Sequence, residues 1–370
     1  MTSSHRKTGA LPSQTILQMI RAGFISGATE ANVRPASLDL SVSSEIYHVE
    51  GIFQPRRKET VREVLNLIKK KKHSLKDPLL CGQMYIARLN ETMQLPESVY
   101  AYCNPKSSSG RIDVHVRLIA DNVSRYDALA PAGWKGEMWI SIVPKTFPIT
   151  IYEGISLNQL RFFTGDTRLT DFELEIAMKE HQLLWKTETK KPYEYSDIKI
   201  RDQDGSLILT LDLKGPVLGY VGIPSKTVVD LAHIGHYPSN KFFKPVKKQG
   251  DFLYLKKGEF YILSTAEAVR VPPDLSCEMV SMDERSGEFR SHYAGFIDPG
   301  WGWGKSGEGK GRPLTLEVRP FEDLIVRQGQ PIGKIRFEHM AEVPEMVYDG
   351  LSSNYLIQTG PKLAKHFKTI

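Results

Sequence analysis

A short loop between residues 102 and 114, YCNPKSSSGRIDV, combines small hydroxyl side chains with two cations. Lys106, Ser107 and Ser108 are followed by Gly110 and Arg111. Arginine pairs bidentately with phosphate oxygens, and hydrogen bonds to charged groups are about twice as strong as neutral ones. The loop therefore predicts a phosphate-binding site, with a polar turn that binds nothing as the alternative.

Two acidic residues in the last third of the chain stand in distinctive surroundings. Glu317 lies in the alternating stretch PLTLEVRP, and Asp298 lies in GFIDPGW. Alternation places Glu317 on the same side of a strand as Thr315, opposite three apolar side chains. A glutamate that is merely exposed to solvent gives the same pattern, so both interpretations stay open at this point.

The composition indicates a globular protein, because 41% of the 370 residues are hydrophobic and 25% are charged. The net charge of +6 would help to attract a small polyanion but does not by itself imply nucleic acid. We interpret the lysine run 69–72 as a solvated face. We expect no membrane span, since no apolar run approaches the roughly 20 residues required, and no signal peptide. Three separated cysteines favour a reducing cytoplasm over a disulfide framework.

An internal repeat is the clearest sign of how the chain is organised. Three stretches recur in the same order: SLDLS as TLDLK, GQMYIARLNETMQLP as GEFYILSTAEAVRVP, and ITIYEGISLNQLRF as LIVRQGQPIGKIRF. Each half contains short strand patterns separated by Gly, Pro, Asn and Asp, which favours antiparallel sandwich or barrel domains. We predict two homologous domains at 1–165 and 195–345, a linker at 166–194 and a C-terminal tail at 346–370. Helices are predicted at 13–23, 61–72 and 171–186.

Several of these stretches together resemble the deoxycytidine triphosphate deaminase and deoxyuridine triphosphatase (dUTPase) superfamily. The family pattern is a serine-rich loop ending in arginine, an I-D-P-G-W hairpin, a strand with L-E and a closing P-G-x-x-I-G strand. The corresponding stretches here are PASLDLS (35–41), PKSSSGR (105–111), AGFIDPGWGWG (294–304), LTLEVRP (314–320) and GQPIGKIRF (329–337). The resemblance implies a mainly β fold of two tandem dUTPase-like distorted β-barrel, or jelly-roll-like, domains with a few helices. It also implies a homo-oligomer, with a trimer as the first expectation.

The two copies of the pattern have diverged in complementary ways. The first copy keeps the serine loop, but its hairpin reads APAGWKG (130–136), without the aspartate, and Ser141 stands where the second copy has Glu317. The second copy keeps Asp298 and Glu317, but its serine loop has become SMDERSGEFR (281–290), whose acidic residues would repel phosphate. We therefore predict one composite site, with phosphate binding from the first domain and chemistry from the second, within one chain or between chains.

The resemblance implies a role for each of the candidate residues of the second copy. Glu317 would activate the water that attacks C4 of cytosine and would return a proton to the leaving amine. Asp298 would contact the deoxyribose 3′-hydroxyl, whereas in the triphosphatase branch an aspartate at this position orients a water for attack on phosphorus. Ala294 and Gly295 would contact the base through their backbone.

The C-terminal tail resembles the family tail that closes over the triphosphate. Tyr348 and Gln358 are assigned to phosphate binding on that basis. The family lysine before the second tyrosine is replaced by Asn354, and Lys362 is a candidate substitute. The insertion GKSGEGKGR (304–312), before the L-E strand, is longer than the family pattern and is a candidate mobile lid.

These assignments predict a cytoplasmic enzyme that deaminates dCTP to dUTP and ammonia, with Mg²⁺ bound by the triphosphate and dTTP as a candidate feedback inhibitor. A zinc deaminase is disfavoured, because no C-x-x-C occurs. The alternatives are a dUTP diphosphatase, a bifunctional enzyme that performs both steps, and a nucleotide-binding regulator without catalysis. The triphosphatase branch has an apolar residue in place of Glu317, and the regulator would be favoured by loss of Asp298 and Glu317, which are both retained.

Overall fold

The computed structural model describes residues 8–198, 204–215, 217–282, 284–291, 295–351 and 358–368. The chain forms two compact units. Among the described residues, unit 1 contains those up to Asp166 together with 224–237 and 364–368, and unit 2 contains those of 167–223 and 238–363. The segments 224–237 and 364–368, predicted to belong to the second domain and the tail, join unit 1 for a physical reason. The first pairs with the strand Ile149–Thr150, and the second hydrogen-bonds to the first.

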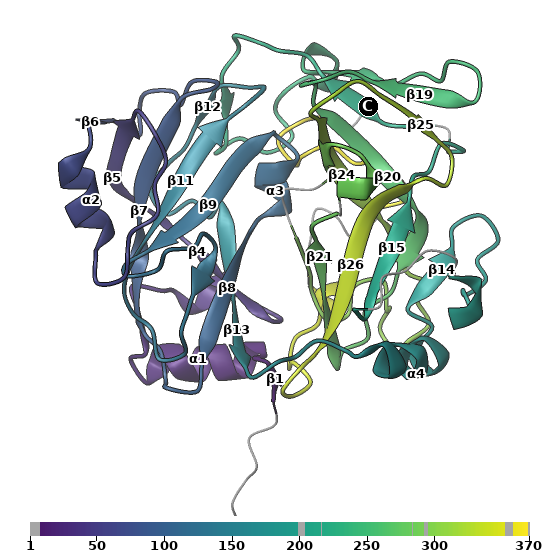
Figure 1. The fold of residues 1–370 in the computed structure, drawn as a ribbon, viewed down its shortest axis with the longest axis horizontal. Coiled ribbons are helices and arrows are strands. Elements are labelled where there is room, and N and C mark those ends of the chain that lie inside the picture. Colours follow the sequence, from purple (N-terminus) through teal and green to yellow (C-terminus); the bar gives the residue numbers. More distant parts are fainter. Residues whose placement is uncertain are drawn as a thin grey trace, which may run out of the picture. The chain divides into compact units, whose positions relative to one another are not determined.

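Unit 1 is mainly β, as predicted (Figure 1). Its strands are β1 Gly9–Ala10, β2 Ile25–Ser26, β3 Val33–Arg34, β4 Ser37–Leu40, β5 Val42–Val49, β6 Lys70–Lys72, β7 Met84–Gln94, β8 Tyr100–Pro105, β9 Val114–Ala120, β10 Ala128–Leu129, β11 Lys135–Pro144, β12 Ile149–Thr150, β13 Asn158–Thr164 and β17 Val229–Asp230. Its helices are α1 Ser13–Arg21, α2 Val61–Leu67 and α3 Ser107–Gly110, with a 3₁₀ turn at Glu30–Asn32.

Two six-stranded antiparallel sheets make up most of unit 1. One has the order β10-β8-β13-β4-β3 with β1 beside β13, and the other has the order β6-β5-β7-β11-β9 with β2 beside β7. Helix α2 lies against the second sheet, since Val61 and Leu65 join a buried cluster with Val49, Ile86 and Trp139 of its strands. Burial of these apolar side chains, at about 25 cal/mol per Å², is what holds so short a helix in place.

Unit 2 is also mainly β and contains the longest helix of the described residues. Its strands are β14 Leu184–Lys186, β15 Ser206–Thr210, β16 Tyr220–Gly222, β18 Phe243–Pro245, β19 Phe252–Leu255, β20 Tyr261–Val269, β21 Leu275–Val280, β22 Phe289–Arg290, β23 Phe296–Ile297, β24 Arg312–Pro320, β25 Leu324–Arg327 and β26 Pro331–His339. Helix α4 spans Asp171–His181, and 3₁₀ turns occur at Tyr195–Asp197, Ser239–Lys241, Glu284–Ser286 and Tyr348–Gly350. The sheets have the orders β18-β16-β20-β24-β22, with β14 beside β20, and β15-β26-β21-β23, and β19 pairs with β25.

The sequence repeat has a structural counterpart, strand for strand. The order β5-β7-β11-β9 of unit 1 corresponds to β16-β20-β24-β22 of unit 2, and β10-β8-β13-β4 corresponds to β23-β21-β26-β15. The register agrees at the level of single residues. Ser141 lies opposite Ile86, and Glu317 lies opposite Ile262, so that both partners are offset by the same 176 positions. Ser141 and Glu317 therefore occupy equivalent places in the two copies.

Two of the predicted helices are too long. Helix α2 ends at Leu67 because Ile68 is extended, and the lysine run continues as strand β6 on the edge of a sheet, with Lys71 and Lys72 exposed. Helix α4 ends at His181 because Gln182 adopts a left-handed conformation (φ 49°), after which the chain continues as β14. In both places the chain pairs with a sheet, although the apolar periodicity of the sequence is also compatible with a longer helix.

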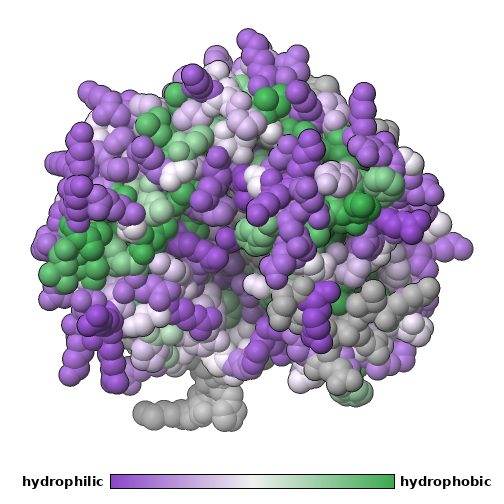
Figure 2. Space-filling model, turned by 45° about the horizontal axis from the view of Figure 1, so that its top comes forward, coloured by the Kyte–Doolittle hydropathy of each residue, from purple (hydrophilic) through white to green (hydrophobic). Residues whose placement is uncertain are grey.

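Polar side chains cover most of the face shown in Figure 2, with apolar residues in scattered groups. Among the described residues, the structure contains no helix that is long and apolar enough to cross a membrane.

Asp204 provides a test of how unit 2 is held together. Its carboxylate lies 3.2 Å from the Lys334 ammonium and 3.0 Å from the Arg336 guanidinium on β26. Although partial burial opposes it, hydrogen bonding to Ser206 and Lys334 lowers the pKa of Asp204 to about 2. Because the folded-state pKa lies below the unfolded value, this stabilisation is complete above about pH 4 and is lost as the pH falls toward 2.

We therefore expect Asp204→Asn to lower the free energy of unfolding at pH 7 by up to about 1 kcal/mol, since the site is partly exposed. Urea unfolding between pH 2 and pH 7 measures this, and the difference from wild type should shrink on acidification. Asp251→Asn, at an exposed turn, is the control and should change neither the free energy of unfolding at pH 7 nor its dependence on pH. A difference that is constant with pH would contradict the ion-pair explanation.

Candidate active site

The predicted phosphate loop follows β8 and forms a single helical turn, α3. The Lys106 amide donates a hydrogen bond to the Leu157 carbonyl (3.0 Å), and the Ser109 hydroxyl donates to the same oxygen (2.8 Å). These bonds attach the loop to the chain just before β13. Ser107 and Ser108 lie in this turn and are half-buried.

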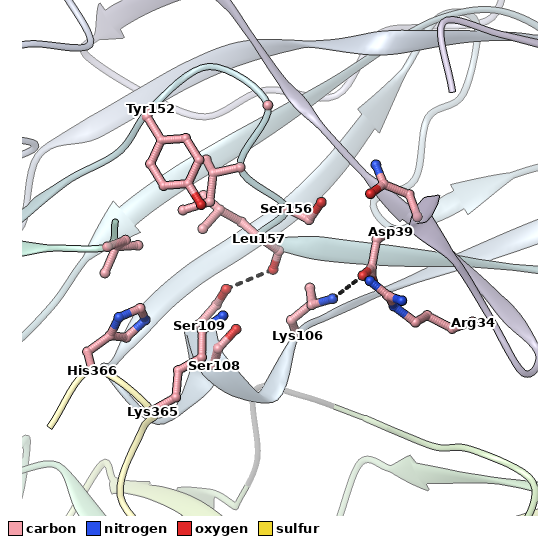
Figure 3. A pocket seen from close by; sticks show the side chains of 14 residues that line it. Arg34, Asp39, Lys106, Ser108, Ser109, Tyr152, Ser156, Leu157, Lys365 and His366 are labelled. Atoms are coloured by element: carbon pink, nitrogen blue, oxygen red, sulfur yellow. Dashed lines mark hydrogen bonds and ion pairs between the residues drawn. The ribbon is translucent and has the colours of Figure 1, made fainter. Parts of the chain in front are cut away.

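A buried carboxylate lies next to this loop and organises two cations. Asp39, on β4, forms ion pairs with the Lys106 ammonium and with the Arg34 guanidinium, the latter at 2.9 Å. All three residues line a cavity of about 210 Å³ together with Ser108 and Ser109 (Figure 3). Sequence analysis identified the loop but missed Arg34 and Asp39, although both lie in or directly before the stretch PASLDLS.

The remaining loop residues lie outside the lining of this cavity. Ser107, Gly110 and Arg111 do not line the cavity, and Gly110 and Arg111 are buried. The phosphate-binding role assigned to them stays a prediction.

Glu317 is buried, with 2% of its surface exposed, in the middle of strand β24. Thr315, on the same side of the strand, is also buried. The interpretation of Glu317 as a solvated strand residue is therefore wrong. The C-terminal tail is attached to the same strand, because the Lys362 amide donates to the Thr315 hydroxyl (3.2 Å) and the Gln358 side-chain amide donates to the Pro313 carbonyl (2.6 Å).

Asp298 follows β23 at the start of a turn and is half-buried. The Trp301 amide donates to the Asp298 carbonyl (3.2 Å), and the Tyr348 amide donates to the Pro299 carbonyl (2.8 Å). The Tyr348 ring also packs on the Trp301 ring, with 5.0 Å between centroids. Tyr348 is therefore seated on the same turn that presents Asp298, whereas Trp301 has a packing role.

The structure describes only one of the two residues that are predicted to contact the base. Gly295 is buried, and its carbonyl accepts a hydrogen bond from the Met279 amide (2.7 Å), which extends the pairing of β21 with β23. Ala294 lies outside the described residues.

The insertion 304–312 is closed on itself by hydrogen bonds. The Glu308 carboxylate accepts from the Lys305 and Ser306 amides at 3.0 and 2.7 Å. The Asp349 carboxylate accepts from the Gly304 amide (2.9 Å) and pairs with both terminal nitrogens of Arg312. These bonds attach the insertion to unit 2 and give no support to the prediction of a mobile lid.

The structure places the candidate residues in two sets. The phosphate loop and its cavity belong to unit 1, and Asp298, Glu317, Tyr348 and Gln358 belong to unit 2. In the described ranges, His, Cys, Asp and Glu side chains form no group of three or more that could hold a metal ion. Among the candidate residues, unit 2 offers the buried carboxylate of Glu317 on strand β24, and unit 1 offers a cationic cavity with serine hydroxyls.

Comparison with known proteins gives a consistent result. Residues 7–166 match the family model of the N-terminal domain of 2′-deoxycytidine 5′-triphosphate deaminase (DCD), and residues 177–367 match the model of its C-terminal domain. The chain also resembles the crystal structure of 2′-deoxycytidine 5′-triphosphate deaminase from Agrobacterium tumefaciens, with a TM-score of 0.81 and 34% identity over 90% of this chain and all of that one.

Curated relatives match a smaller part of the chain. A dUMP-forming dCTP deaminase of Coprothermobacter proteolyticus is 25% identical over 38% of this chain and 74% of its own length. One of Streptomyces avermitilis is 31% identical over 33% of this chain and 63% of its own length. The fold and these matches define a nucleotide-metabolism enzyme of duplicated β architecture. The chain belongs to the 2′-deoxycytidine 5′-triphosphate deaminase family.

The attachment of the tail to β24 can be tested by hydrogen exchange. Gln358→Ala removes the buried hydrogen bond to the Pro313 carbonyl, and the loss of such a bond costs about 1–3 kcal/mol. We expect the backbone amides of 358–360, 362 and 363 to exchange about 5- to 150-fold faster, because local opening becomes easier by that amount. Thr359→Ala, at an exposed neighbouring position, is the control. Equal protection in wild type and Gln358→Ala would show that this bond does not hold the tail.

Proposed function

We propose that this chain catalyses the hydrolytic deamination of dCTP to dUTP and ammonia. Membership of the deaminase family supports this function. The observation that carries it is the buried carboxylate of Glu317, at the position where the other copy of the repeat has Ser141. Charged side chains are seldom fully buried unless they are paired, hydrogen-bonded or used in function.

The reaction needs one group that accepts a proton and later returns it. Glu317 takes a proton from water while the water oxygen bonds to C4 of cytosine, and passes that proton to N3. The same carboxylate then takes the proton of the new C4 hydroxyl and gives it to the exocyclic amine. The C4–N bond breaks, ammonia leaves and a C4 carbonyl remains, so that one water and one dCTP give one dUTP and one ammonia. Burial of Glu317 keeps bulk water away from this exchange.

The remaining candidate residues would bind the substrate. Asp298 is proposed to accept the deoxyribose 3′-hydroxyl, and the backbone of Ala294 and Gly295 to contact the base. The phosphates are proposed to bind Lys106, Ser107, Ser108, Gly110, Arg111, Tyr348 and Gln358. The ion pairs around Asp39 support this, because they hold Lys106 in place before a ligand arrives. Mg²⁺ is proposed to be bound through the triphosphate oxygens and water.

A second reaction is favoured by one observation. The curated relatives are named dUMP-forming, and this chain has Asp298 as well as Glu317. A bifunctional enzyme would use Asp298 to orient a water for attack on phosphorus, releasing pyrophosphate from the dUTP formed. We propose this as the alternative outcome.

Further features rest on the family resemblance alone. We propose that each unit is a dUTPase-like distorted barrel, that the chain forms a homo-oligomer, first expected to be a trimer, and that dTTP is a feedback inhibitor. A cytoplasmic site of action is proposed on the same basis.

The function is tested by following all products together. Purified protein with dCTP and Mg²⁺ should release ammonia and dUTP in equal amounts. Ammonia with pyrophosphate and dUMP would establish the bifunctional alternative. Absence of ammonia would overturn the deaminase assignment, and dUTP would then be tested as the substrate.

The role of Glu317 is tested by comparing the two copies of the repeat. Glu317→Gln should lower kcat for ammonia release by about 10²- to 10⁴-fold, the range for loss of a general acid–base group. The affinity for dCTP should change little. Ser141→Ala alters the equivalent place in the other copy and should leave kcat unchanged. Full activity of Glu317→Gln would remove Glu317 from the mechanism.

A further inference from the structure

The cavity beside the phosphate loop is also lined by the C-terminal segment 364–368. Lys365 and His366 approach it from the side opposite Asp39 and Arg34 (Figure 3). All of these residues belong to unit 1. The volume of about 210 Å³ is below the ~300–1,000 Å³ typical of pockets that enclose a whole small molecule. The cavity therefore suits one part of a ligand.

The charges in the cavity are not balanced. Three cations, Arg34, Lys106 and Lys365, face a single carboxylate, Asp39. Asp39 is already engaged by Lys106 and Arg34. Lys365 is half-buried, and among the described residues its ammonium has no ion pair or hydrogen bond. An unpaired, partly buried cation is unfavourable unless a ligand supplies the missing anion.

The ionisation of Lys365 agrees with this picture. Burial and the neighbouring Lys106 and Arg34 cations lower the pKa of the Lys365 ammonium, and the Asp39 carboxylate only partly opposes them. His366 does not compensate, because burial lowers the pKa of its imidazole and leaves it neutral near pH 7. The excess positive charge of the cavity therefore comes from Arg34, Lys106 and Lys365, and His366 adds none.

The backbone fixes Lys365 at this place. The Lys365 carbonyl accepts a hydrogen bond from the Gly235 amide (2.8 Å), and the His366 carbonyl accepts from the His236 amide (3.0 Å). Nδ1 of His366 lies 3.0 Å from the His233 carbonyl, to which it donates. Phe367 packs against Phe147 and Tyr237. Lys365 is therefore held on a docked segment, unlike a lysine on a free chain end.

We infer that Lys365 is a phosphate ligand of this cavity, contributed by the C-terminal segment to complete the site formed by Lys106 and Ser108. This inference rests on the proposed function for the identity of the nucleotide, dCTP. The phosphate oxygens would meet the Lys365 ammonium on one side and the loop on the other. Asp39 would act as a positioning residue, which holds Lys106 and Arg34 apart from Lys365.

The first experiment measures binding of inorganic tripolyphosphate to the full chain by calorimetry at 0.15 M salt. Lys365→Met should weaken binding about 10- to 100-fold, the range for one hydrogen bond to a charged group. Lys365→Arg should restore most of the affinity. Lys368→Met, on the same segment but exposed, should leave it unchanged. Equal binding by wild type and Lys365→Met, or no binding to wild type at millimolar concentrations, would overturn the inference.

Kinetics with dCTP distinguish a phosphate-binding role of Lys365 from a purely structural role. If Lys365 binds phosphate, Lys365→Met raises KM by a similar factor and leaves kcat for ammonia release almost unchanged. A fall in kcat together with a lower melting temperature, not restored by Lys365→Arg, would mean a structural role and would overturn the inference. If wild type releases no ammonia, the proposed function fails, whereas tripolyphosphate binding still decides the role of Lys365.

Discussion

The pairing of β20 with β24 is the constraint on which the proposed chemistry of this protein depends. It places Glu317 opposite Ile262 in the centre of a sheet, where the backbone cannot shift without breaking its hydrogen bonds. The side chain of Glu317 is buried there. The tail is attached to the same strand, through the hydrogen bonds from the Gln358 side chain to the Pro313 carbonyl and from the Lys362 amide to the Thr315 hydroxyl.

The duplication explains why such a strand was free to specialise. Both copies have the same ladder, and its register gives Ser141 in one and Glu317 in the other. A sheet tolerates either side chain at this position, because its stability comes from the apolar residues on the other face and from the backbone hydrogen bonds. The acidic group and the phosphate loop have therefore been retained in different copies without loss of the fold.

The sequence predicted those parts of the structure that depend on local patterns. The repeat, the strand alternation and the loop 105–111 all follow from spacing, and the structure shows a mainly β fold in each unit. Alternation could not show that Glu317 is buried, because it tells which side of a strand a residue faces and not what other parts of the chain cover that side. Arg34, Asp39 and Lys365 escaped notice for the same reason. They meet only in three dimensions, and each is an ordinary residue in its own segment.

The tail links these observations, because a single segment serves both sets of residues. Its residues up to Leu363 belong to unit 2, where Gln358 and Lys362 bond to β24, and the next five belong to unit 1, where Lys365 lines the phosphate cavity. A ligand that binds Lys365 would therefore stabilise the docking of 364–368 on the segment 233–237 of unit 1. By linkage, whatever favours this docked segment also favours the ligand.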